Sequence, residues 1–225
     1  MIHTYEILKP FEDNIGHAVF DRTIDPFDTS TIQKLLGSKE QPYQFTQQLH
    51  GTKHYLIKEL PSESRPHEGD ILLTQIPQLP LIIRVADCGS IFFYDPEHKA
   101  IANVHAGWRG IAQKIIPRTI DLMQQAFSTD RTKLIACLSP MVGPCCTEFT
   151  DPKTELPSFL HAYILEENYV DLWGAVEGQL IGSGIPKENI EIARICTVCT
   201  PEHYHSYRRD KENAGRFCTG IMLKA

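Results

Sequence analysis

The sequence lacks the long apolar run that a membrane-spanning helix requires. Such a helix needs about 18 or more consecutive apolar residues, and no stretch of this kind occurs among the 225 residues. The opening segment MIHTYEILKPFEDN also lacks the basic and apolar parts of a secretory signal peptide. We therefore expect no membrane partner and no export.

A basic excess is missing as well. The chain has 22 Lys and Arg against 28 Asp and Glu, a formal net charge of −6. General nucleic-acid binders usually carry a basic surplus, so we do not expect nucleic acid as a partner. A small anion stays compatible with this balance, because individual arginines can hold one on an acidic protein.

Repeats, low-complexity segments and long linkers are absent too. Hydrophobic residues at 42% and charged residues at 22% are ordinary for a soluble globular protein, and a chain of this size buries roughly 70% of its unfolded surface. We expect one domain over residues 1–225. The seven cysteines, an odd number, indicate reduced thiols and a cytoplasmic location. No coiled-coil pattern or apolar edge is evident, so we expect a monomer.

Short apolar runs bounded by turn residues predict strands. The expected strands are Thr4–Leu8, Gly16–Phe20, Tyr43–Gln48, Tyr55–Lys58, Asp70–Thr74, Pro80–Val85, Ser90–Tyr94, Ala100–Val104, Leu134–Leu138, Ile190–Ile195 and Phe217–Met222.

Helical spacing is found mainly in the second half of the chain. Apolar residues recur at this spacing from Ile111 to Phe127, and Pro117 either kinks the helix or opens a new one. A second helix is expected at Val170–Ile181, and loops are expected at Pro61–Gly69 and Phe149–Pro157. Strands with interspersed helices predict an α+β fold with mixed β-sheets.

The segment from Val85 to Gly110 contains the most informative pattern. Two apolar strands flank the turn-rich tetrapeptide Asp95-Pro96-Glu97-His98, so they should form an antiparallel hairpin. If the two central residues of the tetrapeptide form the loop, Cys88 faces His105. Their Cβ atoms would then lie about 5 Å apart.

A thiol and an imidazole at this distance permit two chemistries. The histidine can activate the cysteine as a nucleophile, or both can ligate a metal such as zinc. His50 is the candidate third ligand, because it ends a predicted strand and precedes the flexible Gly51. The alternative without function is that Cys88 is a small buried side chain and the histidines lie on the surface.

Six motifs in this sequence resemble those of one known family. They are Gln48-Leu49-His50-Gly51, Ala86-Asp87-Cys88, His105-Ala106-Gly107-Trp108-Arg109-Gly110, Gly143-Pro144-Cys145-Cys146, Cys196-Thr197-Val198-Cys199 and Ser206-Tyr207-Arg208-Arg209-Asp210. The family is that of the laccase-domain (YfiH-like) purine nucleoside phosphorylases, also called polyphenol oxidases. The ordered matches cover roughly three-quarters of the chain.

The resemblance implies a single domain with mixed β-sheets between helices, in α/β/β/α-like layers. It implies catalysis at a zinc ion held by His50, Cys88 and His105. The implied reactions are phosphorolysis of adenosine, inosine, guanosine and methylthioadenosine, and deamination of adenosine. The partners are then a purine nucleoside and phosphate. Copper can displace zinc by the general affinity order.

Phosphorolysis also needs a phosphate clamp, for which a guanidinium is the natural group. We assign substrate binding to Arg109, Arg208 and Gln48. Arg209 is a further candidate, although it or Arg208 can instead pair with a neighbouring aspartate.

Two more residues leave alternatives open. Asp87 orients a ligand histidine or satisfies backbone donors at its turn. Trp108 either stacks on a base or packs in the core or at the rim of the site, and we favour packing.

The remaining cysteines favour a structural interpretation. A zinc ribbon needs two spaced pairs, but Cys145 and Cys146 are adjacent, which is poor geometry for chelation, so the Cys196–Cys199 motif stands alone.

Other functions at the Cys88 site are a cysteine hydrolase and an enzyme editing peptidoglycan precursors. Copper-dependent phenol oxidation is disfavoured, because the ten histidines include one H-x-H pair, His203 and His205.

Overall fold

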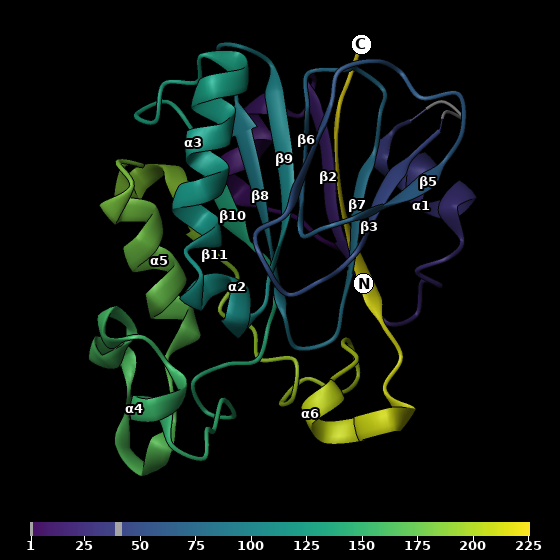
Figure 1. Cartoon of the computed structure of the whole chain (residues 1–225). Coiled ribbons are helices and arrows are strands. Elements are labelled where there is room, and N and C mark those ends of the chain that lie inside the picture. The colour runs from purple at the N-terminus through teal and green to yellow at the C-terminus, as the bar shows by residue number, and fades with distance from the viewer. Residues whose placement is uncertain (1, 39–41) are drawn as a thin grey trace.

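The computed structural model describes residues 2–38 and 42–225. Within them, two six-stranded mixed β-sheets pack face to face, and helices cover the outer faces (Figure 1). The predicted α+β fold with mixed sheets between helices is therefore confirmed.

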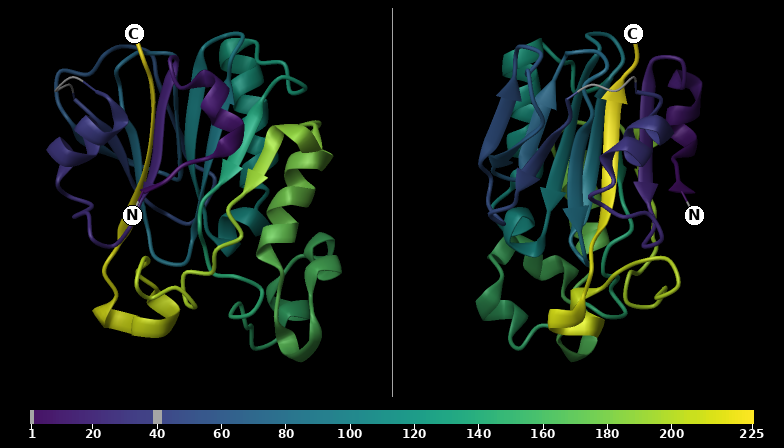
Figure 2. Two further views of the ribbon diagram at one scale, coloured as in Figure 1. Left: turned by 180° about the vertical axis from the view of Figure 1, so that it is seen from behind. Right: turned by 90° about the vertical axis from the view of Figure 1, so that its right-hand side faces the viewer.

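The first sheet contains strands from both ends of the chain. Its order is β1 (Ile2–His3), β2 (Ile15–Phe20), β12 (Phe217–Leu223), β7 (Leu81–Val85), β3 (Gln44–Gln47) and β5 (Arg65–Glu68). The pairs β3–β7 and β3–β5 are parallel and the others antiparallel. In the right-hand view of Figure 2 the yellow β12 lies near the middle, with the purple N-terminal segment on one side and blue and teal strands on the other.

The second sheet contains the hairpin that carries the site. Its order is β11 (Ile190–Ile192), β10 (Ile135–Leu138), β8 (Gly89–Asp95), β9 (Ala100–Ala106), β6 (Ile71–Thr74) and β4 (His54–Ile57). All residues of β8 and β9 are buried, because one face packs on the first sheet and the other on helices. Burial on both faces explains why these strands read as nearly continuous apolar runs.

Helices supply the two outer layers. The α-helices are α1 (Thr29–Leu36), α2 (Trp108–Ala112), α3 (Ile115–Phe127), α4 (Pro152–Glu155), α5 (Leu172–Gly182) and α6 (Tyr207–Asp210). The 3-10 helices are Glu6–Phe11, Ser158–Tyr163, Glu166–Asn168, Lys187–Asn189 and Lys211–Asn213. Helices α3 and α5 cover the second sheet, and α1 covers the first. No helix in the described ranges is long and apolar enough to cross a membrane.

Three local predictions need correction. Thr4–Leu8 is not a strand but leads into the 3-10 helix at Glu6–Phe11, because Tyr5 and Leu8, three residues apart, are both buried. The expected loop at Pro61–Gly69 contains β5, which tolerates its proline because it is an edge strand. The loop at Phe149–Pro157 contains the short helix α4.

The proline in the long helical segment opens a new helix rather than kinking one. Helix α2 ends at Ala112, and Pro117 lies in the first turn of α3, where its missing N–H leaves no hydrogen bond unmade. Between the helices Lys114 has a positive φ of 60°. The break therefore precedes the proline.

The hairpin register differs from the predicted one by two residues. Asp95 pairs with Ala100, and Ser90 pairs with His105. The loop has four residues, because Asp95 Oδ1 accepts the N–H groups of Glu97 and His98. A slip of two keeps every side chain on its face, so the thiol of Cys88 still reaches His105.

A half-buried histidine in β2, His17, makes the stability of the fold depend on pH. The N–H of Tyr5 donates to His17 Nε2 at 3.0 Å. Burial, with smaller effects of His3 and Lys224, lowers the pKa of His17 from 6.5 to about 4. Between these values the unfolded chain binds a proton here that the folded chain does not, so stability falls as pH falls.

We expect the free energy of unfolding to decrease by up to about 3 kcal/mol on this account between pH 7 and pH 4. Urea denaturation of the wild type and of His17→Gln at both pH values measures the effect, since glutamine cannot titrate. An equally steep pH dependence in the variant would contradict the assignment.

Candidate metal centre and active site

Three predicted ligands meet at one end of the two sheets. His50 follows β3, Cys88 lies in the turn between β7 and β8, and His105 lies in β9. Their ligand atoms all lie within 4.8 Å of one another, and the two imidazole rings are 4.9 Å apart at 84°. His105 is buried, Cys88 half-buried and His50 exposed, so the cluster opens to the surface on one side.

A buried aspartate that the sequence analysis missed holds two of these ligands. Asp70, which has no exposed surface, accepts a hydrogen bond from His105 Nδ1 at 2.7 Å. It also accepts the backbone N–H groups of Leu49, His50 and Gly51, at 3.3, 3.0 and 2.9 Å. The first contact leaves Nε2 of His105 for a ligand, and the others hold His50 at its positive φ of 58°. This is the carboxylate–histidine arrangement that supports metal ligands.

The electrostatics of the cluster favour a thiolate. Burial alone would raise the pKa of Cys88, but the hydrogen bonds and charges of His105 and His50 lower it to about 6. Burial would likewise lower the pKa of His105, but Asp70 and Cys88 raise it to about 9. Cys88 is therefore prepared as a thiolate, which is the form that binds a metal or attacks as a nucleophile.

Gly107 leaves the space that the three ligands need. A Cβ atom at this position would lie 2.9 Å from Cys88 Sγ and 3.4 Å from His50 Cδ2. The backbone φ of −73° accepts alanine without strain.

We expect Gly107→Ala to reduce metal affinity about tenfold or more, because overpacking costs about 1–3 kcal/mol, while the protein stays folded. Chelator competition measures the affinity. The matched control is Gly182→Ala, whose Cβ would meet nothing within 4 Å. Equal affinities in the two variants would show that the space at Gly107 is not required.

The cluster forms part of a cavity of about 760 Å³. Basic, acidic and aromatic side chains surround it. The basic ones are Arg84, Arg109, Arg208, Lys211 and Arg216, the acidic ones Asp87, Glu148 and Glu155, and the aromatic ones Trp108, Phe149 and Tyr207. Five cations against three carboxylates make this cavity attractive to an anion although the whole chain is acidic.

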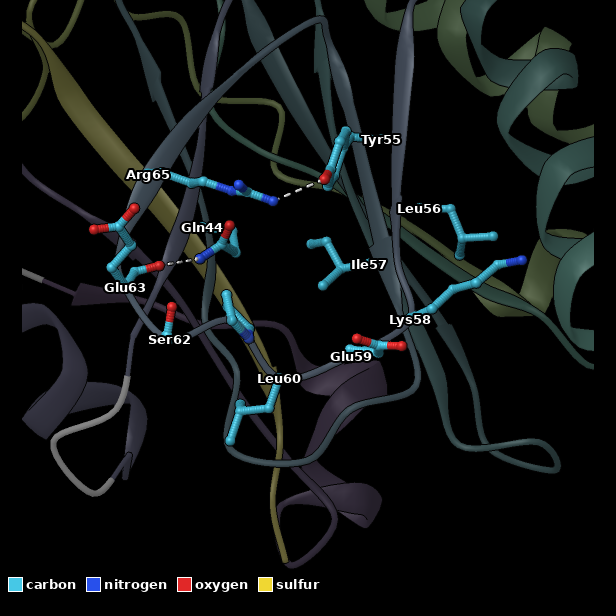
Figure 3. A pocket seen from close by; sticks show the side chains of 11 residues that line it. Gln44, Tyr55, Leu56, Ile57, Lys58, Glu59, Leu60, Ser62, Glu63 and Arg65 are labelled. Atoms are coloured by element: carbon cyan, nitrogen blue, oxygen red, sulfur yellow. Dashed lines mark hydrogen bonds between the residues drawn. The ribbon is translucent and has the colours of Figure 1, made fainter.

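A second hollow, of about 490 Å³, lies beside β4 and β5 (Figure 3). Its lining includes Tyr55, whose hydroxyl accepts a hydrogen bond from Arg65, and Gln44, whose amide donates to the carbonyl of Glu63. Its described lining contains no cysteine or histidine. None of the predicted site residues belongs to it.

The predicted substrate residues all line the larger cavity. They differ in whether their side chains are already engaged in hydrogen bonds. The Gln48 amide donates to the carbonyl of Arg84, so it positions β7. Arg208 Nη2 donates to the carbonyl of Glu148 at 2.6 Å. The Arg109 guanidinium lies 4.3 Å from the Trp108 ring and, within the described ranges, has no hydrogen-bond or ion-pair partner. Of these three residues, Arg109 is thus the one best placed to receive an anion.

The structure decides the alternatives for Arg209 and Asp87, and it shows Trp108 both packed and facing the cavity. Arg209 forms an ion pair with Asp210 at 2.7 Å and does not line the cavity, so it is structural. Asp87 accepts the hydroxyl of Thr197 and the N–H of Arg208, so it satisfies donors and Asp70 orients the histidine instead. Trp108 packs edge-on against Phe149 at 5.3 Å and also lines the cavity.

The fold and site define an α+β protein with a Cys/His cluster of metal-ligand composition at one end of two mixed sheets. The chain belongs to the family described as multi-copper polyphenol oxidoreductase laccase, whose model matches residues 14–224. The resemblance drawn from the motifs is therefore confirmed.

Several relatives carry the name purine nucleoside phosphorylase. The one from Bacteroides thetaiotaomicron is 32% identical over 166 residues, which are 70% of this chain and 62% of the relative. The one from Aquifex aeolicus is 32% identical over 171 residues, 75% of this chain and 77% of the relative. The chain thus spans less than two thirds of the Bacteroides protein.

Solved structures share the fold. YlmD from Geobacillus stearothermophilus matches with a TM-score of 0.77 and 24% identity, over 91% of this chain and 82% of that one. The hypothetical protein YfiH from Bacillus licheniformis matches with a TM-score of 0.75 and 24% identity, over 86% and 79% of the two chains.

Proposed function

We propose that the protein is a zinc-dependent purine nucleoside phosphorylase whose active site is the cavity around His50, Cys88 and His105. The observation that carries the proposal is that this cluster and the unpaired Arg109 line one cavity. The names of the Bacteroides and Aquifex relatives support it.

The donor set fits zinc. One thiolate and two imidazoles are ligands that zinc accepts in catalytic sites, and three protein ligands leave a position for water or substrate. Bound there, zinc would supply Lewis-acid polarisation of a substrate oxygen. Copper fits the same donors as a substitute, because it stands above zinc in the affinity order.

The side chains of the cavity account for the rest of the reaction. Phosphorolysis breaks the bond between C1′ and the purine nitrogen and forms a bond from C1′ to a phosphate oxygen, while the proton that the hydrogen phosphate loses goes to the leaving base. Arg109 holds the phosphate, with Arg208 beside it. Trp108 and Phe149 offer an apolar surface to the purine ring. Adenosine deamination is a second reaction that we propose for the same cavity.

The test is base release from adenosine, inosine, guanosine and methylthioadenosine, with and without phosphate. Release of free purine only with phosphate supports phosphorolysis, and ammonia release without phosphate supports deamination. A zinc-loaded protein that does neither would overturn the proposal.

A cysteine hydrolase is the second candidate, favoured by the lowered pKa of Cys88 beside His105. It predicts activity that survives removal of the metal by a chelator and is lost when Cys88 is alkylated. A phosphorylase of the proposed kind loses activity on chelation and regains it with zinc.

The role of Arg109 gives a specific prediction. We expect Arg109→Gln to raise the KM for phosphate about 10- to 100-fold, because a charge-assisted hydrogen bond contributes about 1.5–3 kcal/mol, with little change in the KM for the nucleoside. Steady-state kinetics with each substrate varied in turn measures this. The matched control is Arg118→Gln on α3, an exposed arginine outside the cavity. Equal effects on both KM values would contradict a phosphate clamp.

A further inference from the structure

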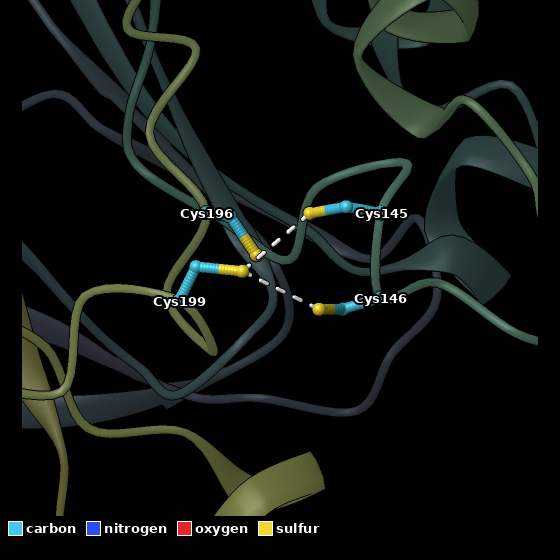
Figure 4. Close-up of side chains that lie close together, drawn as sticks. All are labelled: Cys145, Cys146, Cys196 and Cys199. Atoms are coloured by element: carbon cyan, nitrogen blue, oxygen red, sulfur yellow. Dashed lines mark hydrogen bonds between the residues drawn. The ribbon is translucent and has the colours of Figure 1, made fainter.

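Four cysteines outside the described site lie together on two loops. Cys145 and Cys146 follow β10, and Cys196 and Cys199 precede α6, about fifty residues later. Figure 4 shows the four thiols turned toward one another across the gap between the loops. All four sulfur atoms lie within 4.8 Å of one another, and Cys199 Sγ is 3.6 Å from both Cys145 Sγ and Cys146 Sγ.

We propose that Cys145, Cys146, Cys196 and Cys199 form a second metal centre, a four-thiolate zinc site that fastens the two loops together. Sulfur atoms at the corners of a zinc tetrahedron with bonds of about 2.3 Å lie about 3.8 Å apart. The two distances of 3.6 Å are close to these edges, and they are far from the roughly 2.05 Å of a disulfide. All seven cysteines are free thiols.

The backbone around the cluster is arranged as thiolate sites require. The N–H of Gly143 donates to Cys196 Sγ at 3.3 Å. Four thiolates are one of the ligand sets that structural zinc sites use.

The adjacency of two of the cysteines, which the sequence analysis judged poor for chelation, does not prevent this geometry. The segment after Gly143 is a tight turn, in which the N–H groups of Cys146 and Thr147 both donate to the Gly143 carbonyl. Within this turn both neighbouring thiols approach Cys199.

The four-cysteine cluster lies beside the walls of the larger cavity but does not line it. Thr147, Glu148 and Phe149, which line the cavity, come directly after the first cysteine pair. Thr197, between the second pair, donates its hydroxyl to Asp87 at 2.7 Å, one residue from Cys88. A metal in the thiol cluster would therefore hold two walls of the cavity in place. This inference does not depend on the proposed function.

The experiment measures zinc content in the full chain, purified under reducing conditions, stripped with a chelator and reloaded with zinc chloride. We expect two zinc ions per wild-type chain, one in Cys88→Ala and one in Cys146→Ser/Cys199→Ser. Cys218→Ala, which removes a buried cysteine outside both clusters, is the matched control and keeps two. If Cys88→Ala binds no zinc while its thiols are reduced, the proposal is wrong.

Two further measurements keep the result interpretable if the double variant does not fold. The single variant Cys145→Ser changes an exposed residue, and chelator competition should show about a hundredfold weaker binding at this site. Cobalt-loaded Cys88→Ala should show thiolate-to-cobalt charge transfer. The proposal would be overturned if Cys145→Ser left the zinc affinity unchanged, or if cobalt-loaded Cys88→Ala showed no charge-transfer band. It would also be overturned if the four cysteines formed disulfides and the protein took up no zinc at this site after these were reduced. Because these readouts are independent of nucleoside turnover, the failure of the proposed function would be seen separately.

Discussion

Cys88→Ala is expected to lower phosphate-dependent purine release about a thousandfold. Cys88 Sγ is the single sulfur donor among the three clustered ligands, and two imidazoles alone hold zinc weakly. Loss of the metal removes several kcal/mol of transition-state stabilisation, and each 1.36 kcal/mol is a factor of ten in rate. The fold should persist, because the half-buried side chain lies in a turn.

Turnover and zinc content of the purified variant measure the effect. Cys218→Ala is the control, because it also deletes a thiol but lies in β12 and does not line the cavity, and it should retain its activity. Full turnover by Cys88→Ala would remove the cluster from the mechanism.

Asp70→Asn should damage both the metal site and the fold. Oδ1 accepts from His105 Nδ1 and the N–H of His50, while Oδ2 accepts from the N–H groups of Leu49 and Gly51. In asparagine one of these oxygens is replaced by an NH₂ group, which is a donor. In either orientation of the amide, this NH₂ group faces N–H donors that it cannot accept from. We expect the free energy of unfolding to fall by about 3 kcal/mol. We expect the zinc affinity to fall about 10- to 100-fold.

Urea denaturation and chelator competition measure the two effects. Asp95→Asn is the matched control, because Asp95 is also fully buried and also caps a loop. Its Oδ1 takes both N–H groups, and its Oδ2 faces only His98 Nδ1, which can accept from an amide. Asp95→Asn should therefore leave zinc affinity unchanged. Equal losses in the two variants would show that Asp70 acts only as a buried carboxylate.

Local patterns predicted much of the fold. Most strands were placed within one or two residues, because each is a short apolar run bounded by turn residues. The hairpin prediction was wrong by two residues in register, since the hydrogen bonds of Asp95 that lengthen the loop are not visible in the strand pattern. It was correct about the shared face of Cys88 and His105, because that depends only on parity.

Contacts between distant segments were not predictable in the same way. Asp70 is 35 residues from His105, and the strand pattern indicates only that it begins a strand. A carboxylate at the start of a buried strand was the signal available. The cluster of Cys145 and Cys199 depends on where two irregular loops meet, which no periodicity encodes.

The positions of the metal ligands also have a consequence for how the protein matures. His50 follows a strand of the first sheet and His105 lies in a strand of the second, while Cys88 sits on the connection between the sheets. No half of the sandwich alone contains the donor set. In a newly made chain the proposed metal site of His50, Cys88 and His105 therefore assembles only when the two sheets have docked, so we expect metal uptake at this site to follow folding.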